Sequence, residues 1–277
     1  MADRYTHGHH PSVLASHQWR SAENSARYLL DHLTEGASLL DVGCGPGNIT
    51  VDFAQRVGGG SVIGLDRSAE VITAARSQYG ATTGLSFVVG DVYHLEFSDE
   101  KFDVVHAHQV LQHLSRPVAA IEEMRRVLRP GGVLAVRDAD YGAFAWAPSD
   151  PLLDRWRELY HALTRRNGAE ADAGRHLKSW VLRGGFSDVT TTSSTWTYES
   201  LDERQWWGGL WAERAVSSDF AHQSLEYGLT NEGELNEIAA AFRRWALRED
   251  AIFVIPHVEV LARRSPIWAP DAARPVP

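Results

Sequence analysis

The sequence predicts an α/β protein built on a doubly wound parallel sheet with helices on both faces. Between residues 37 and 140, short apolar runs typical of buried strands alternate with amphipathic runs of helical spacing. A glycine-rich turn at residues 43–47 connects the first of these strands to the first helix. Parallel strands need a crossover connection, and nearly all such crossovers are right-handed. The alternation therefore predicts the handedness of the connections as well as the class.

Each element is predicted from local signals. Apolar runs predict five parallel strands, at residues 37–43, 61–66, 85–91, 102–108 and 133–138. Helical spacing, an N-cap at Ser68 and terminating glycines predict helices at residues 49–57, 68–79 and 115–128. Two further helices are expected at residues 151–167 and 175–183. A run rich in Thr and Val predicts a sixth strand at residues 187–197, and its antiparallel partner is expected at residues 251–263.

The order of these elements predicts one domain with two helical additions. We expect an N-terminal helical lid at residues 1–35, a core at 36–196, a helical insertion at 197–250, the last core strand at 251–265, and a loose tail at 266–277. An insertion of about fifty residues at one end of a sheet usually has a function, and we expect it to cover a substrate.

Composition narrows the possible partners and location. The chain has 277 residues and a formal net charge of −9, which argues against a nucleic-acid partner because such binding sites are usually basic. The single cysteine, Cys44, allows no intrachain disulfide and favours the cytoplasm. No apolar segment resembles a signal peptide or a membrane span. We expect a cytoplasmic monomer or homodimer without a membrane or nucleic-acid partner.

The glycine-rich turn is the strongest functional signal. Its spacing is Gly-x-Gly-x-Gly after Asp41, and Asn48 stands where a dinucleotide-binding loop would need glycine. Asp66 ends the second strand, and Gly90-Asp91-Val92 ends the third. Together with the segments at residues 102–114 and 128–132, these motifs resemble those of class I S-adenosylmethionine (SAM)-dependent methyltransferases. The resemblance is greatest to the UbiE-type branch, which acts on small molecules.

The resemblance implies a Rossmann-like, doubly wound, seven-stranded sheet. Its strand order would be 3-2-1-4-5-7-6, with the last strand antiparallel. The cofactor would be SAM and the product S-adenosylhomocysteine, with Asp66 accepting hydrogen bonds from the ribose hydroxyls and Asp91 contacting the adenine amine. The residues expected to bind the cofactor are Tyr5, Asp41, Gly43, Cys44, Gly45, Gly47, Asn48, Asp66, Arg67, Gly90, Asp91, Val92, His106 and His108. For His106, a place in the core is the alternative.

Methyl transfer requires an aligned acceptor and, for many acceptors, a base. The candidates for catalysis are His113, Glu23 and Tyr28. His113 could equally have a structural or cofactor-side role, and Glu23 could form only a surface ion pair with Arg27, four residues along a helix. We expect no metal, because the fourth strand ends in His-Ala-His-Gln rather than in the acid that magnesium would favour.

Ten tryptophans predict an aromatic pocket, although most of them could simply pack the lid. The residues expected to bind the acceptor are His7, His10, Trp19, Asp138, Trp206, Trp207 and Trp211. An aromatic wall suits a flat, hydrophobic acceptor of the natural-product type, and it stabilises a developing cation.

The first residues form a separate signal, Tyr5-Thr6-His7-Gly8-His9-His10. The segment resembles actinobacterial small-molecule methyltransferases that begin Tyr-Thr-His-Gly-His, a group with enzymes that methylate indole C3 of tryptophan-containing diketopiperazines to give pyrroloindolines. Alternatives are O- or N-methylation of another metabolite and a non-methylating SAM-binding protein or cyclase. We expect this segment to close over the site as a lid, with Tyr5 and at least one of His7 and His10 facing cofactor or acceptor.

Overall fold

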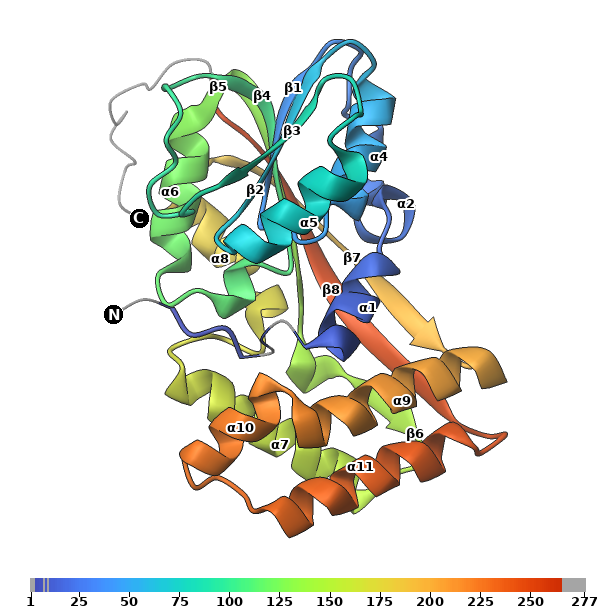
Figure 1. Ribbon diagram of the computed structural model, residues 1–277. Coiled ribbons are helices and arrows are strands. Elements are labelled where there is room, and N and C mark those ends of the chain that lie inside the picture. The colour runs from blue at the N-terminus through green and yellow to red at the C-terminus, as the bar shows by residue number, and fades with distance from the viewer. Residues whose placement is uncertain (1–2, 7, 9, 266–277) are drawn as a thin grey trace, which may run out of the picture.

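The computed structural model describes residues 3–6, 8 and 10–265. A twisted sheet forms the upper part of the molecule, and a group of helices lies beyond one end of its strands (Figure 1). The strands are β1 (Ser38–Val42), β2 (Ser61–Asp66), β3 (Leu85–Val89), β4 (Phe102–His108), β5 (Leu128–Ala139), β6 (Ala145–Ala147), β7 (Asp188–Tyr198) and β8 (Ile252–Arg263).

The observed topology confirms the predicted strand order. The sheet runs β3-β2-β1-β4-β5-β8, with β1 to β5 parallel and β8 antiparallel to β5. β7 pairs with β8 along its whole length. When the short strand β6 is left out of the count, β7 and β8 are the sixth and seventh strands, and the order is the predicted 3-2-1-4-5-7-6. The sequence did not predict β6, which pairs with residues 252–254 of β8, because three residues are too few to show a periodicity.

Helices cover both faces of the sheet and create two separate cores (Figure 1). α4 (Asn48–Val57) and α5 (Ala69–Tyr79) cover one face, and α6 (Pro117–Val127) and α8 (Ala173–Arg183) cover the other. Adjacent residues of a strand point to opposite faces, so Leu39 packs in the α4/α5 core while Leu40 packs in the α6/α8 core. Both leucines are fully buried, which explains why β1 reads as a continuous apolar run.

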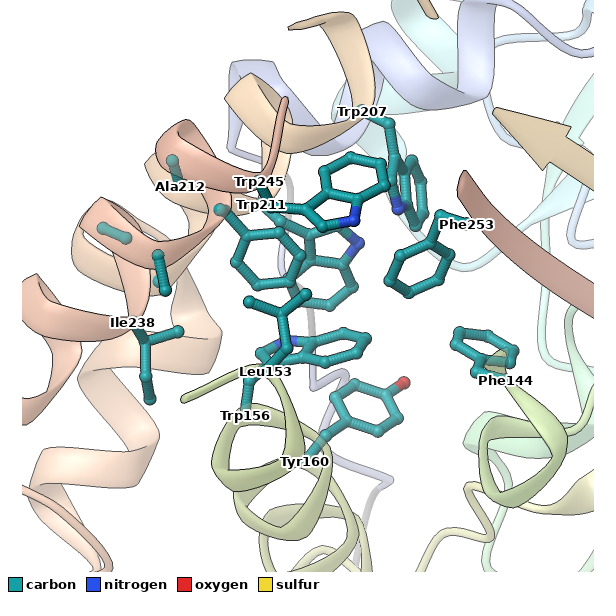
Figure 2. Close-up of a cluster of buried hydrophobic side chains, with 14 of the residues drawn as sticks. Phe144, Leu153, Trp156, Tyr160, Trp207, Trp211, Ala212, Ile238, Trp245 and Phe253 are labelled. Atoms are coloured by element: carbon teal, nitrogen blue, oxygen red, sulfur yellow. The ribbon is translucent and has the colours of Figure 1, made fainter. Parts of the chain in front are cut away.

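The remaining long helices form a layer with its own aromatic core, and we call this layer the lid after its predicted role. They are α7 (Pro151–Arg166), α9 (Leu201–Ser217), α10 (Asp219–Glu226) and α11 (Glu232–Ala246). Figure 2 shows Trp156 and Trp211 at the centre of this core, where their ring centroids lie 4.5 Å apart and both side chains are fully buried. The lid therefore includes α7 in addition to the predicted insertion.

The N-terminal segment lies between the lid and the sheet. It contains α1 (Pro11–Gln18), α2 (Ala22–Ser25) and α3 (Arg27–Leu30). Arg214 of α9 donates hydrogen bonds to the backbone oxygen of Ser12 and to Ser16 Oγ, at 2.7 and 2.6 Å, and so fastens α1 to the lid. Within residues 3–6, 8 and 10–265, no helix is long and apolar enough to cross a bilayer.

Candidate active site

A cavity opens where the carboxyl ends of β1, β2 and β4 meet the lid and α1. Ligands of doubly wound sheets bind at this edge, because the strand order reverses there and leaves a crevice between neighbouring connections. The cavity has one end lined by the glycine-rich turn and acidic residues, and another lined by aromatic side chains.

The glycine-rich turn is shaped by backbone conformations that favour glycine. Gly43, Gly45 and Gly47 all have positive φ, and the turn leads directly into the N-terminus of α4. A Cβ added to Gly43 would lie 2.4 Å from Val110 Cγ2, and one added to Gly47 would lie 2.8 Å from the Phe87 ring. Gly43, Cys44, Gly45 and Asn48 line the cavity, whereas Gly47 lies behind it.

Asp41 is positioned by buried partners at the end of β1. Its two carboxylate oxygens contact Thr50 Oγ1 at 2.6 Å and His106 Nδ1 at 2.7 Å. His106 is fully buried and does not line the cavity, so its position does not support direct cofactor binding and agrees with the alternative of a core histidine. Its position in β4 instead lets it orient the Asp41 carboxylate from behind.

Two further acids complete the polar end of the cavity. Asp66 accepts hydrogen bonds from the backbone N–H groups of Gly45 and Ser68, at 3.1 and 3.0 Å. Asp91 follows β3 and accepts one from the Tyr93 N–H at 2.9 Å. Both acids line the cavity, and so do the other predicted residues near them, Arg67, Gly90 and Val92.

The end of β4 and the turn after it bring two histidines to the cavity lining. His108 and His113 both line it, and the Tyr5 ring packs edge-on against His113 with 4.8 Å between centroids. Burial, reinforced by the charge of Arg20, lowers the pKa of His113 to about 3 and that of His108 well below its usual value. Both imidazoles are therefore neutral at physiological pH.

Aromatic side chains from three parts of the chain form the other end. Trp19 lies edge-on to Trp196 at 5.2 Å between ring centroids and 5.6 Å from Trp206. Trp207 stacks on Tyr198 at 4.7 Å. Trp19, Trp206 and Trp207, which the sequence predicts to bind the acceptor, thus all line the cavity.

Trp211, Asp138 and Tyr28 do not line the cavity. Trp211 is fully buried in the lid core, one helical turn beyond Trp207 but turned away. Asp138 is fully buried, and its Oδ1 accepts a hydrogen bond from the Gln112 N–H at 3.2 Å. The Tyr28 hydroxyl is enclosed, which raises its pKa well above the usual value. The structure therefore does not support the predicted contacts of these three side chains with ligands.

The predicted roles of Glu23 and His10 are also not supported by their positions. Glu23 is exposed and pairs with Arg27 and Arg56, which is the surface ion pair named as its alternative. His10 accepts a hydrogen bond from the Ser12 N–H at 3.3 Å and so caps α1, away from the cavity lining. His7 lies outside the described residues.

Sequence reasoning missed several lining residues, namely Arg20, Gln109, Tyr141, Tyr198 and Arg214. Arg214 follows Trp207 by seven residues, a spacing that places both on one side of a helix and could have revealed it. Arg20 directly follows Trp19, but nothing in the local pattern distinguishes it from a surface arginine.

The fold and the cavity define an α/β protein that binds its ligands at the carboxyl edge of a parallel sheet. The family model for a methyltransferase domain matches residues 33–190, and the chain belongs to this methyltransferase family. An uncharacterized methyltransferase of Schizosaccharomyces pombe is 32% identical over 258 residues, covering 89% of this chain and 91% of that protein.

Solved structures share the fold at low sequence identity. The YcgJ protein of Bacillus subtilis superposes with a TM-score of 0.59 at 17% identity, covering 88% of this chain and 99% of that one. A phosphoethanolamine N-methyltransferase of Haemonchus contortus, solved in complex with SAM, superposes with a TM-score of 0.53 at 15% identity. The match covers 84% of this chain and 50% of that one.

Proposed function

We propose that this protein transfers the methyl group of SAM to a small aromatic acceptor. The observation that carries the proposal is the single cavity with two chemically different ends, one acidic beside a glycine-rich turn and one aromatic. The family assignment and the SAM complex of the Haemonchus neighbour support the choice of cofactor.

The polar end fits the nucleoside and methionyl parts of SAM. A ribose diol is a double hydrogen-bond donor, and Asp66 offers a carboxylate at the end of β2 that can accept from it. Asp91 provides a second carboxylate for the adenine amine. Gly43 and Gly45 have no side chains, so the backbone of the turn can approach the cofactor closely.

The aromatic end fits a flat acceptor held next to the methyl donor. SAM supplies an activated methyl group, so this chain need only align the acceptor and handle its proton. His113 lines the cavity as a neutral imidazole and is the candidate to receive the acceptor's proton. Because a pKa of about 3 makes it a weak base, this role requires that the bound ligands raise the pKa of His113. Tyr5, packed against its ring, would hold the imidazole in place.

Within this class, C3-methylation of the indole of a tryptophan-containing diketopiperazine is the specific hypothesis, and O- or N-methylation of another aromatic metabolite is the alternative. Attack by indole C3 leaves a cation on the ring, and the indoles of Trp19, Trp206 and Trp207 can stabilise it through their π faces. The resemblance of the N-terminal segment supports the indole hypothesis.

Cofactor binding is tested by calorimetric titration with SAM and S-adenosylhomocysteine. We expect binding in the micromolar range, and Asp66→Asn should weaken it about 10- to 100-fold because hydrogen bonds to the carboxylate are lost. The exposed Asp188 of β7 provides the matched control, and Asp188→Asn should bind as the wild type does. An absence of binding below millimolar concentration would refute the proposal.

Turnover is tested by incubating the protein with SAM and a panel of aromatic acceptors that includes a tryptophan diketopiperazine. A gain of one methyl mass with loss of the indole absorbance band would indicate C3-methylation. A methylated product with an intact indole would indicate O- or N-methylation. Tight cofactor binding without turnover of any acceptor would favour a non-methylating protein.

We also propose that the N-terminal segment is a lid over this site. Tyr5 lines the cavity, and α1 is tied to α9 through Ser12 and Ser16. Deletion of residues 1–12 should therefore weaken cofactor binding or turnover strongly, since the cavity would lose one wall and admit water. Unchanged kinetics would show that the segment is only a tail.

A further inference from the structure

Two arginine side chains line the aromatic end of the cavity. Arg214 is 4% exposed, and its guanidinium lies 5.2 Å from the Trp211 ring. Arg20 donates a hydrogen bond to Gln109 Oε1 at 2.6 Å, and its guanidinium lies 5.7 Å from the Trp196 ring. Arg214 therefore places a positive charge beside an aromatic ring, where little water can solvate it, whereas the Arg20 side chain is partly exposed.

Neither arginine has a carboxylate partner among residues 3–6, 8 and 10–265. The Nε atoms of both are buried and make no hydrogen bond within that part of the chain. Arg137 is a useful contrast to Arg214, because it is buried to a similar degree but pairs with Glu259 at 3.2 Å. Buried charges in proteins are usually paired in the manner of Arg137, since an isolated one is costly to desolvate.

The tyrosines around Arg214 do not supply the missing negative charge. Burial raises the pKa of Tyr5 to about 12 and raises the pKa values of Tyr141 and Tyr160. All three phenols are therefore neutral at physiological pH. The charge of Arg214 must be compensated by something that enters the cavity.

The cofactor alone can compensate only one of the two arginines. SAM carries a single carboxylate, together with an ammonium and a sulfonium. Arg20 donates a hydrogen bond to Gln109, which directly follows β4. The next residue, Val110, lies against Gly43 of the glycine-rich turn. Arg214 belongs instead to α9, the helix that provides Trp206 and Trp207 to the acceptor end.

We propose that the acceptor is an aromatic carboxylate whose anionic group pairs with Arg214. This inference rests on the proposed function, because it assigns a charge to the acceptor of the same site. A planar guanidinium binds a carboxylate through two parallel hydrogen bonds, which also fixes the direction of the attached ring. Among indoles, it favours one with a free acid group over a neutral diketopiperazine.

The structural alternative is that Arg214 only fastens α1 to the lid through Ser12 and Ser16. Two substitutions separate the roles. Arg214→Gln keeps an amide donor for these oxygens but removes the charge. Arg214→Lys keeps the charge but loses the planar pair of N–H donors that binds a carboxylate through two hydrogen bonds. If Arg214 only fastened α1, the protein would have the same affinity for an anionic ligand and for a neutral ligand of the same shape.

The test is calorimetry on the complex with S-adenosylhomocysteine, using matched acid and amide pairs: indole-3-acetate with indole-3-acetamide, and benzoate with benzamide. We expect the wild type to bind at least one acid about 10- to 100-fold more tightly than its amide. Arg214→Gln should abolish that preference, and Arg214→Lys should retain part of it. Because Arg214 also holds α1, the binding of S-adenosylhomocysteine by each variant is measured first, and acid and amide are then compared on saturated protein.

Equal binding of acid and amide, no binding of any acid, or a preference that survives in Arg214→Gln would overturn the inference. If Arg214→Gln does not fold, as judged by thermal melting, Arg214→Lys decides the question through a reduced preference. Failure of the wild type to bind S-adenosylhomocysteine would overturn the proposed function itself. Binding of S-adenosylhomocysteine without acid preference would overturn only the charge assigned to the acceptor.

Discussion

Replacing Asp138 by asparagine should make the protein less sensitive to rising pH. The carboxyl group is fully buried at the end of β5, and within the described ranges its Oδ2 has no hydrogen-bond partner. Burial raises its pKa from 3.8 to about 8, which means that the folded protein keeps this proton at physiological pH. The neutral acid and the asparagine amide are close in size and shape.

The sign follows from proton linkage. Between pH 4 and pH 8 the unfolded chain has lost the Asp138 proton and the folded chain has kept it. The stabilising contribution is thus complete below pH 4 and is lost as the pH rises toward 8. With pKa values of 3.8 and about 8, the free energy of unfolding should fall by about 2–3 kcal/mol between pH 5.5 and pH 7.5 from this group alone.

Urea unfolding of wild type and Asp138→Asn at pH 5.5, 6.5 and 7.5 measures this contribution. The difference in unfolding free energy between the two proteins should shift in favour of the variant by about 2–3 kcal/mol over this range, since other titrating groups cancel. Asp188→Asn, at an exposed position of β7, should follow the wild type throughout. A difference that does not change with pH would refute the assignment of Asp138 as a neutral buried acid.

Three further outcomes are expected. Trp211→Ala should lower the free energy of unfolding by ~3–5 kcal/mol in urea melts, because it empties the centre of the lid core; a loss below ~1 kcal/mol would contradict that packing. Gly43→Ala should weaken SAM binding about tenfold or more in calorimetry, because its Cβ would lie 2.4 Å from Val110 Cγ2. Gly59→Ala, with a positive φ but open space around it, should bind SAM normally. Glu23→Gln should leave turnover unchanged and alter stability by less than ~1 kcal/mol, and a large loss of kcat would restore its catalytic role.

Local patterns were sufficient for the sheet and for the polar end of the cavity. A buried parallel strand must be apolar on both faces, and the end of each strand is visible in the sequence as the place where acids and glycines begin. Asp66 and Asp91 were found in this way. The three-residue strand β6 was not, because its pairing with β8 is decided by tertiary contacts.

Side-chain direction could not be predicted from local patterns. Trp207 and Trp211 share a helical spacing, yet Trp207 lines the cavity and Trp211 is enclosed by α7 and α11. His106 and His108 are two residues apart in β4 and so point to the same face of the sheet, yet only His108, the last residue of the strand, lines the cavity. Which tryptophan or histidine meets a ligand depends on the elements packed opposite it, and these lie far away in the sequence.

The sequence by itself determined the alternation of strands and helices through local periodicity, and the glycine-rich turn through backbone conformations that glycine permits. The family and the strand order followed from the resemblance of its motifs. Only the tertiary structure decided that Glu23 is a surface residue and that Arg20 and Arg214 line the same cavity. The two arginines are 194 residues apart. We propose a ligand-binding role for their charges because neither has a carboxylate partner in the described part of the chain, and no local pattern in the sequence reveals this.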